Sequence, residues 1–237
     1  MKTNRQKRSN NKGFAEIFGT HAVYAALLNS NRSHIKLFVN QNQRESLSKD
    51  MLKLSPEINE LHNKEMFKMF GNESTHQGIV LRTSKLKQPK LEEYIKESKD
   101  LISNIVVVLD QVTDPNNIGA ILRSCALFNC STVIVSNDNA PDATATMAKA
   151  ASGALEVVNY ISVVNLSRAI IEFKKNNYWV YGFDSNKKKI KDKNNLDLPK
   201  KCVLVFGSEG KGLRNLTKKE CDDLISIPTK PNREYNI

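Results

Sequence analysis

Short apolar runs alternate with longer segments of helical periodicity in the C-terminal part of the chain. The clearest run is IVVVL at residues 105–109. Because it contains no polar position, it predicts a strand that is buried on both faces. The predicted strands are residues 104–110, 132–136, 178–183, 202–206 and 223–227, and the predicted helices are residues 117–129, 142–152 and 165–176. This alternation is typical of an α/β fold with a mostly parallel sheet and helices on both faces.

The N-terminal part of the chain carries a shorter pattern of the same kind. The predicted elements are a helix at residues 19–28, strands at residues 35–39 and 79–81, and a second helix that begins within residues 55–61. Pro56 would occupy the first position of that second helix, where its missing N–H is tolerated. We therefore expect a small N-terminal α/β domain at residues 13–84.

Polar segments without periodicity mark the domain boundaries. Residues 1–12 hold five basic residues and no acidic one, and this composition predicts a disordered basic tail. Residues 85–100 are polar and lysine-rich, and we interpret them as a linker that runs into a helix. Residues 101–237 then form the predicted C-terminal domain.

The charge of the chain favours a polyanionic partner. The formal net charge is +11 and the isoelectric point is about 9.4. Besides the N-terminal tail, a second basic cluster lies at residues 187–193. Such a surface suits a nucleic acid, and a lysine-rich surface without a ligand is the alternative.

The sequence predicts neither a membrane span nor a metal site. No apolar run reaches the about 18 residues that a transmembrane helix needs, and no apolar signal region follows the basic N-terminus. We therefore expect a cytoplasmic protein. The cysteines Cys125, Cys130, Cys202 and Cys221 lack zinc-site spacing, and we expect reduced thiols in a core.

A first polar motif follows the strand at residues 104–110. Residues 114–117, Asp-Pro-Asn-Asn, predict a turn, after which a helix is expected to begin near Asn117 as its N-cap. Gly119 and Arg123 lie four positions apart and so share one helix face. Gly119 would admit a close backbone or ligand, and Arg123 would project along that face. An ordinary capped helix with a surface arginine is the alternative.

A second motif follows the strand at residues 202–206. Gly207, Gly210 and Gly212 frame Glu209. The segment is not a phosphate-binding Walker loop, because Lys211 is followed by glycine, and it lacks the dinucleotide-binding spacing. A glycine loop of this kind presents backbone N–H and C=O groups to a ligand, and a structural turn is the alternative.

In this order, about 80 residues apart, the two motifs resemble the first two motifs of the SpoU (TrmH/RlmB-like) family of RNA ribose methyltransferases. The resemblance extends over about residues 14–237. It is carried further by residues 19–23 and 76–79 near the ends of the N-terminal domain, by residues 148–156, and by residues 225–228.

The resemblance implies S-adenosylmethionine as the methyl donor and a ribose 2′-hydroxyl of RNA as the acceptor. It also implies an N-terminal RNA-binding domain similar to ribosomal L30e, a SPOUT-type trefoil knot in the C-terminal half, and a homodimer. The RlmB-like branch, which methylates a guanosine of 23S ribosomal RNA, is favoured by the separate N-terminal domain. A tRNA 2′-O-methyltransferase is the alternative.

The resemblance also assigns roles to single residues. Arg123 is the catalytic arginine, Asn117 positions it or the RNA, and Glu209 orients Arg123 or holds the cofactor site. Because the pKa of arginine exceeds about 12, we prefer Arg123 as an electrostatic and positioning group, with a transiently neutral Arg123 as the alternative. The implied cofactor contacts are Gly207, Ile227, Tyr235 and Asn236.

The third motif departs from the family pattern. Asn236 matches the motif asparagine and Tyr235 its leucine, whereas Glu234 replaces the family serine. The long helix that follows in the family has no counterpart, so the C-terminal domain is expected to be truncated in this motif. An RNA-binding relic without catalysis is the corresponding alternative function.

Overall fold

The computed structural model describes residues 13–72, 76–138, 141, 143–184 and 198–226. The chain divides into two compact units. The first unit comprises Met1–Lys87, Pro115–Ser124 and Asp142–Val157, and the second comprises Gln88–Asp114, Cys125–Pro141 and Val158–Ile237. The predicted basic tail, the basic cluster at residues 187–193 and the third motif from residue 227 onward lie outside the described residues.

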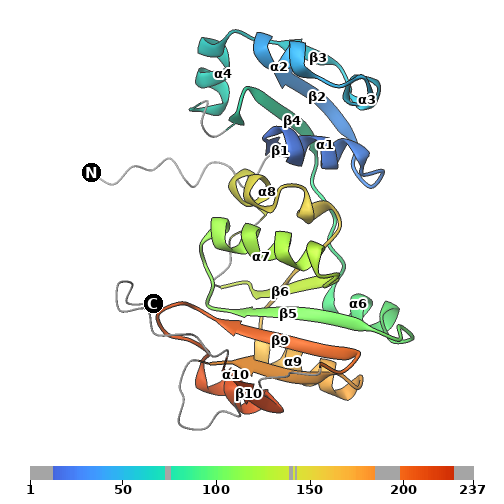
Figure 1. Ribbon diagram of the computed structural model, residues 1–237, viewed down its shortest axis with the longest axis vertical. Helices are drawn as coiled ribbons and strands as arrows, with labels where there is room; N and C mark the ends of the chain where they lie inside the picture. The colour runs from blue at the N-terminus through green and yellow to red at the C-terminus, as the bar shows by residue number, and fades with distance from the viewer. Residues whose placement is uncertain (1–12, 73–75, 139–140, 142, 185–197, 227–237) are drawn as a thin grey trace. The chain divides into compact units, whose positions relative to one another are not determined.

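The first unit contains a four-stranded mixed sheet in the order β1-β4-β2-β3 (Figure 1). Its strands are β1 (Phe14–Phe18), β2 (His34–Val39), β3 (Ile58–Glu60) and β4 (Ile79–Ser84), and its helices are α1 (Thr20–Leu28), α2 (Gln41–Ser46), α3 (Lys49–Leu54) and α4 (Asn63–Phe70). β4 runs antiparallel to both β1 and β2, whereas β3 runs parallel to β2. The predicted helix at residues 19–28 and the strands at residues 35–39 and 79–81 are confirmed.

The predicted helix within residues 55–61 is wrong, because this segment forms β3. The backbone N–H of Leu37 donates to the carbonyl of Glu57, and that of Leu61 donates to the carbonyl of Val39. Three residues gain a parallel strand partner on β2 in this way, and this long-range pairing outweighs the local helix signal of Pro56.

The first unit also holds a helical layer from the middle of the chain. Its helix α8 (Ala145–Ala151) packs against β1 and α1 (Figure 1). The helix α7 (Pro115–Leu127) meets α8 at Gly119, where an added Cβ would lie 2.5 Å from Cβ of Ala150 and 2.8 Å from the carbonyl oxygen of Met147. Gly119 therefore lets the backbone of α8 approach α7 closely. The sequence predicts either a close backbone or a ligand at this position.

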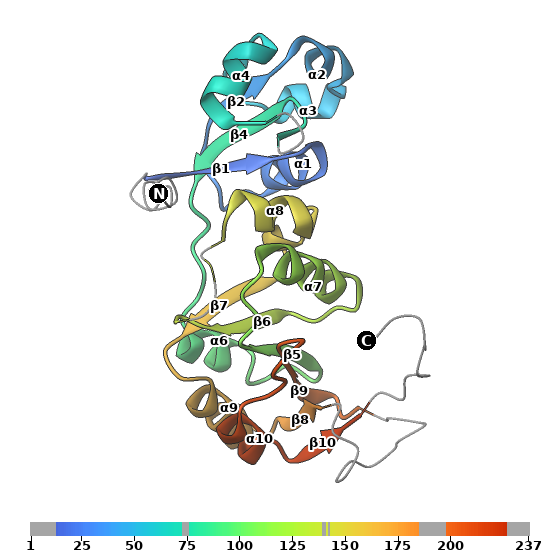
Figure 2. The same cartoon turned by 90° about the vertical axis from the view of Figure 1, so that its left-hand side faces the viewer.

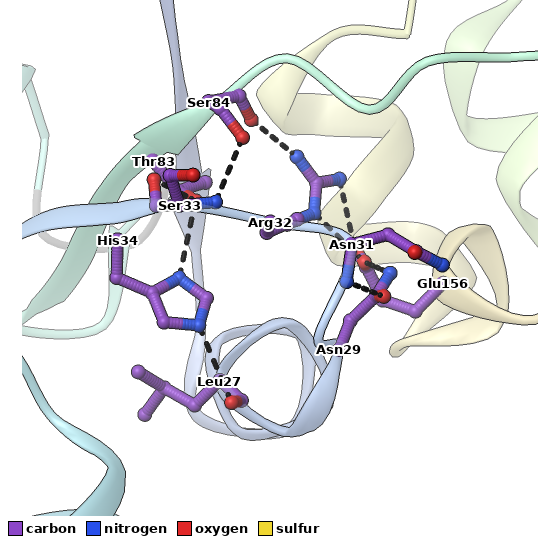
Figure 3. A network of polar contacts seen from close by, with 9 residues as sticks. All are labelled: Leu27, Asn29, Asn31, Arg32, Ser33, His34, Thr83, Ser84 and Glu156. Carbon is purple, nitrogen blue, oxygen red and sulfur yellow. Dashed lines mark hydrogen bonds and ion pairs between the residues drawn. The ribbon is translucent and has the colours of Figure 1, made fainter.

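A buried ion pair joins the segment after α8 to the loop after α1 (Figure 3). The carboxylate of Glu156 accepts hydrogen bonds from Nε and Nη2 of Arg32, both at 2.8 Å, and from Nδ2 of Asn29 at 2.7 Å. Nη1 of Arg32 donates to the carbonyl of Ser84 at 2.8 Å. The two charged side chains are only 6% and 5% exposed, so each charge depends on the other for its stabilisation.

The second unit is a parallel sheet of six strands in the order β10-β8-β9-β5-β6-β7. Its strands are β5 (Asn104–Asp110), β6 (Thr132–Ser136), β7 (Asn159–Val163), β8 (Trp179–Phe183), β9 (Lys201–Gly207) and β10 (Asp223–Ile225), and its helices are α6 (Leu91–Glu97), α9 (Leu166–Lys175) and α10 (Asn215–Glu220). Figure 2 shows α9 and α10 side by side.

One face of this sheet carries the main core of the second unit. Val106 and Val108 of β5 and Val203 and Val205 of β9 are fully buried there. They form one cluster with apolar side chains of α6 and α9, including the fully buried Phe173. The predicted α/β class with a parallel, helix-flanked sheet is confirmed, and β7 is a strand that the sequence pattern did not predict. Within the described residues, no helix is long and apolar enough to cross a membrane.

Neutralising Glu156 should destabilise the first unit strongly. We expect Glu156→Gln to lower the free energy of unfolding by about 3–5 kcal/mol, because Arg32 would keep a buried charge without a counter-charge. Chemical denaturation followed by circular dichroism measures this change. The matched control is Glu57→Gln, which removes the ion pair between Glu57 and Lys36. Because the Glu57 side chain is 66% exposed, this substitution should lower the free energy of unfolding by less than about 1 kcal/mol. Equal effects of the two substitutions would contradict this account.

Candidate functional site

The two polar motifs predicted from the sequence begin at neighbouring strand ends. β5 pairs with β9 along its whole length, and Asp110 is the register partner of Gly207. From β5 the chain continues to β6 on one side, whereas β9 lies on the other side of β5. In open parallel sheets, ligands bind outside the carboxyl ends of strands at such a reversal of strand order. We therefore place the candidate site at the carboxyl ends of β5 and β9.

A buried carboxylate fastens the loop after β9 to the end of β5. Asp110 is fully buried, and its side chain accepts hydrogen bonds from the backbone N–H of Arg214 at 2.9 Å and from Nε of Arg214 at 2.7 Å. Hydrogen bonds between charged groups are stronger than neutral ones. Asp110 therefore joins the end of β5 to Arg214 in the segment that follows β9.

The loop after β9 is closed on itself. A Cβ added at Gly207 would lie 2.2 Å from the carbonyl carbon of Gly212, so only glycine lets the two backbone segments approach this closely. The N–H of Gly212 donates to the carbonyl of Ser208 at 2.9 Å, and Gly212 has a φ of +63°, a conformation that favours glycine. This closure leaves Glu209, Gly210 and Lys211 exposed at the tip of the loop.

Two further contacts support the strand ends beside this loop. The rings of Phe183 and Phe206, at the ends of β8 and β9, are stacked with centroids 4.5 Å apart. Nζ of Lys218 lies 2.5 Å from Oδ2 of Asp184, which follows β8 directly. Both contacts join neighbouring segments at the carboxyl edge of the sheet.

The helix α7 carries Asn117 and Arg123 and begins earlier than predicted. It starts at Pro115, so Asn117 lies in its first turn, and the predicted N-cap role of Asn117 is wrong. The fixed φ of proline suits the first helical position, which explains the earlier start. Ile118 and Leu122 are fully buried, whereas Asn117 and Arg123 are exposed.

The predicted site residues are thus distributed over the described and undescribed parts of the chain. Gly207 and Glu209 belong to the second unit, and Asn117 and Arg123 belong to the part of α7 in the first unit. Ile227, Tyr235 and Asn236 lie outside the described residues. The roles of all seven residues stay predictions.

Sequence reasoning did not find Arg214 as the partner of Asp110, because nothing in the local sequence links positions 104 residues apart.

Two of the four thiols, those of Cys202 and Cys221, are unsuited to nucleophilic chemistry. Burial raises the pKa of the Cys202 thiol to about 11, and burial together with the nearby Asp222 carboxylate raises that of Cys221 to about 12. The reactive thiolate is therefore scarce at these positions near neutral pH. All four cysteines are free, as predicted. In the described part of the chain, no group of three His, Cys, Asp or Glu side chains is arranged to hold a metal ion.

Family models match both parts of the chain. A model described as the SpoU rRNA Methylase family matches residues 104–235, which include both motifs of the candidate site. A model described as RNA 2′-O ribose methyltransferase substrate binding matches residues 17–89. The chain is therefore similar to such proteins over most of its length.

Individual relatives agree with these models. The 23S rRNA (guanosine-2′-O-)-methyltransferase RlmB of Pasteurella multocida is 36% identical and that of Haemophilus influenzae 34% identical, each over 90% of this chain and 87% of the relative. The crystal structure of the SpoU methyltransferase AviRb from Streptomyces viridochromogenes, in complex with the cofactor AdoMet, aligns with a TM-score of 0.72. That alignment covers 97% of this chain and 86% of the other at 20% identity, so it shows the fold alone.

A side chain at Gly207 should disrupt the site, whereas one at Gly210 should not. We expect Gly207→Ala to lower the free energy of unfolding by about 1–3 kcal/mol, because the added methyl group overpacks against the backbone of Gly212. Gly210→Ala is the matched control, since a Cβ there meets no atom within 4 Å, and its effect should stay within about 0.5 kcal/mol. Thermal unfolding of both variants measures the difference. A fully stable Gly207→Ala variant would contradict the closed loop.

Proposed function

This chain belongs to the SpoU rRNA methylase family, and we propose that it transfers a methyl group from S-adenosylmethionine to the ribose 2′-hydroxyl of a guanosine in 23S ribosomal RNA. The single observation that carries the proposal is the register of β5 and β9, which sets the starts of the two motifs side by side at one sheet edge. The relatives that are 34% and 36% identical and carry the name of this activity supply the substrate.

The described residues fit the proposed cofactor at the loop after β9. S-adenosylmethionine supplies an electrophilic methyl group when it is bound. Gly207 closes the loop, and the exposed tip at Glu209 and Gly210 presents backbone groups that suit a polar ligand with an adenine ring and a carboxylate. Gly207 and Glu209 would hold the cofactor from this side, and Ile227, Tyr235 and Asn236 are the proposed contacts from the third motif.

Arg123 is the proposed catalytic residue. An arginine guanidinium offers five N–H donors in a planar fork. A ribose hydroxyl beside a phosphate is held in line for attack when such a fork binds both groups. Arg123 is exposed on a helix whose Ile118 and Leu122 are fully buried, so the helix is anchored while the side chain remains accessible. Asn117, six residues nearer the start of the helix, is the proposed positioning group.

The two parts of the chain have separate proposed tasks. Residues 13–84 bind the RNA substrate and residues 101–237 carry the transfer reaction. Residues 85–100, which include α6 of the second unit, connect the two parts. The net charge of +11 supports binding to a polyanion. A homodimer, a trefoil knot in the C-terminal part and a cytoplasmic location complete the proposal, and they rest on family membership alone.

Removing the guanidinium of Arg123 should abolish methyl transfer without unfolding the protein. We expect Arg123→Ala to lower the rate by about 100-fold or more, the loss that is typical when one electrostatic donor to a transition state is removed. The assay measures transfer of a radiolabelled methyl group from S-adenosylmethionine to unmodified 23S ribosomal RNA. Arg168→Ala, at another exposed helical arginine, is the matched control and should keep the full rate. A near-normal rate of Arg123→Ala would overturn the assigned role.

A further inference from the structure

The first unit contains a polar pocket of about 290 Å³ that the proposed reaction does not use. It lies where β2 and β3 end and α2 and α4 begin. The polar side chains that line it are Asn40, Gln41, Asn42, Glu60, His62 and Asn63. Ligand pockets span about 300–1,000 Å³. This pocket therefore has the size for one small planar group and is too small for a whole nucleotide cofactor.

The floor of the pocket is held rigidly by Asn40, which is only 3% exposed. Its Oδ1 accepts from the backbone N–H of Gln43 at 2.9 Å, and its Nδ2 donates to Oδ1 of Asn63 at 2.9 Å. A Cβ added at Gly78 would lie 2.6 Å from this amide group, so the neighbouring backbone leaves it no room to move. The pocket is therefore shaped before any ligand arrives.

Other polar groups of the lining remain available to a ligand. Because Oδ1 of Asn63 accepts from Asn40, the amide nitrogen of Asn63 is left to donate elsewhere. The exposed side chains of Asn42 and Glu60 make no hydrogen bond or ion pair with any residue that the structure describes. The pocket thus offers amide donors and acceptors together with one carboxylate.

This chemistry fits the edge of a nucleobase better than a phosphate. Side-chain amides and carboxylates hydrogen-bond to base edges, whereas phosphates attract Lys and Arg. The described lining contains neither Lys nor Arg, and the Glu60 carboxylate would repel a phosphate. Guanine is the base with two adjacent donors on its Watson–Crick edge, which a single carboxylate can accept together.

We propose that this pocket receives one unpaired nucleobase of the RNA, and that Glu60 gives it a preference for guanine. Unpaired bases in RNA loops are splayed out and read on their edges in this way. The inference rests on the proposed function for the claim that RNA is the ligand. It goes beyond that function by assigning base recognition to a site in residues 40–63, outside both motifs of the candidate methyl-transfer site.

The test compares the dissociation constants of RNA strands that differ in one base only. Attraction between the basic protein and the RNA backbone is the same for all strands and therefore cancels in the ratio. Fluorescein-labelled oligouridine decamers carry guanosine, adenosine, cytidine or an abasic site at one central position, and fluorescence anisotropy gives the dissociation constant of each with the full chain. We expect the guanosine strand to bind roughly tenfold tighter than the abasic strand, as one well-made pair of base contacts allows. Because base contacts release few counterions, this ratio should hold at several salt concentrations.

Glu60→Gln should remove the preference, whereas Glu57→Gln should keep it. Glu57 and Glu60 lie three positions apart, and each substitution removes one negative charge. Any increase in RNA affinity that comes from the lost charge alone should therefore be the same in both variants. Asn42→Ala should also lower the ratio, with the exposed amide Asn31→Ala as its control. Equal binding of all four strands, or a preference that survives Glu60→Gln, overturns the proposal.

The methyl-transfer assay on the unmodified chain separates this proposal from the function on which it rests. A base preference that depends on Glu60 supports the pocket even where methyl transfer is absent, and in that case the proposed reaction fails alone. Methyl transfer without any base preference overturns the pocket and leaves the reaction standing.

Discussion

The buried carboxylate of Asp110 is the interaction on which the candidate site depends. It ends β5, is fully buried, and binds both the backbone and the side chain of Arg214. Since Asp110 also stands in register with Gly207, one residue connects the end of β5 to both ends of the loop that follows β9. A charged group that is buried and paired in this way is costly to separate from its partner, and the loop is correspondingly fixed.

A fixed loop and an accessible side chain serve different parts of the proposed reaction. The closed backbone between Gly207 and Gly212 presents groups in a constant geometry, which is what orientation of a bound ligand requires. Arg123 is exposed, as its proposed contact with a large RNA substrate requires. Its helix is nevertheless anchored, because Gly119 places it against the backbone of α8. The fold thus combines anchored backbone segments with exposed side chains.

The sequence predicted those parts of the fold that depend on local pattern. The unbroken apolar run at residues 105–109 could be read as a buried strand because four of its five positions are buried. β3 could not be predicted, because a three-residue strand with Pro56 just before it looks like a helix start until β2 supplies its partner. The start of α7 was predicted two residues too late. Residues 114–117 were interpreted as a turn before the helix, whereas the helix already begins at Pro115.

The site was predictable to a smaller degree. The two motifs were found from their residues and from family resemblance, and the strand register explains why they belong together. The pairs Asp110–Arg214 and Arg32–Glu156 join positions more than 100 residues apart, and no periodicity reveals such contacts. The pocket at Asn40 was equally hidden, because in the sequence its residues are ordinary polar positions at the ends of short elements.

The central claim is that the carboxyl edge of β5 and β9 forms a methyl-donor site. Its most direct test is a calorimetric titration of the purified chain with S-adenosylmethionine, with the mass in solution recorded on the same sample. The account predicts saturable binding in the micromolar range. The absence of binding heat over several temperatures, from a chain that is folded by circular dichroism, would contradict it.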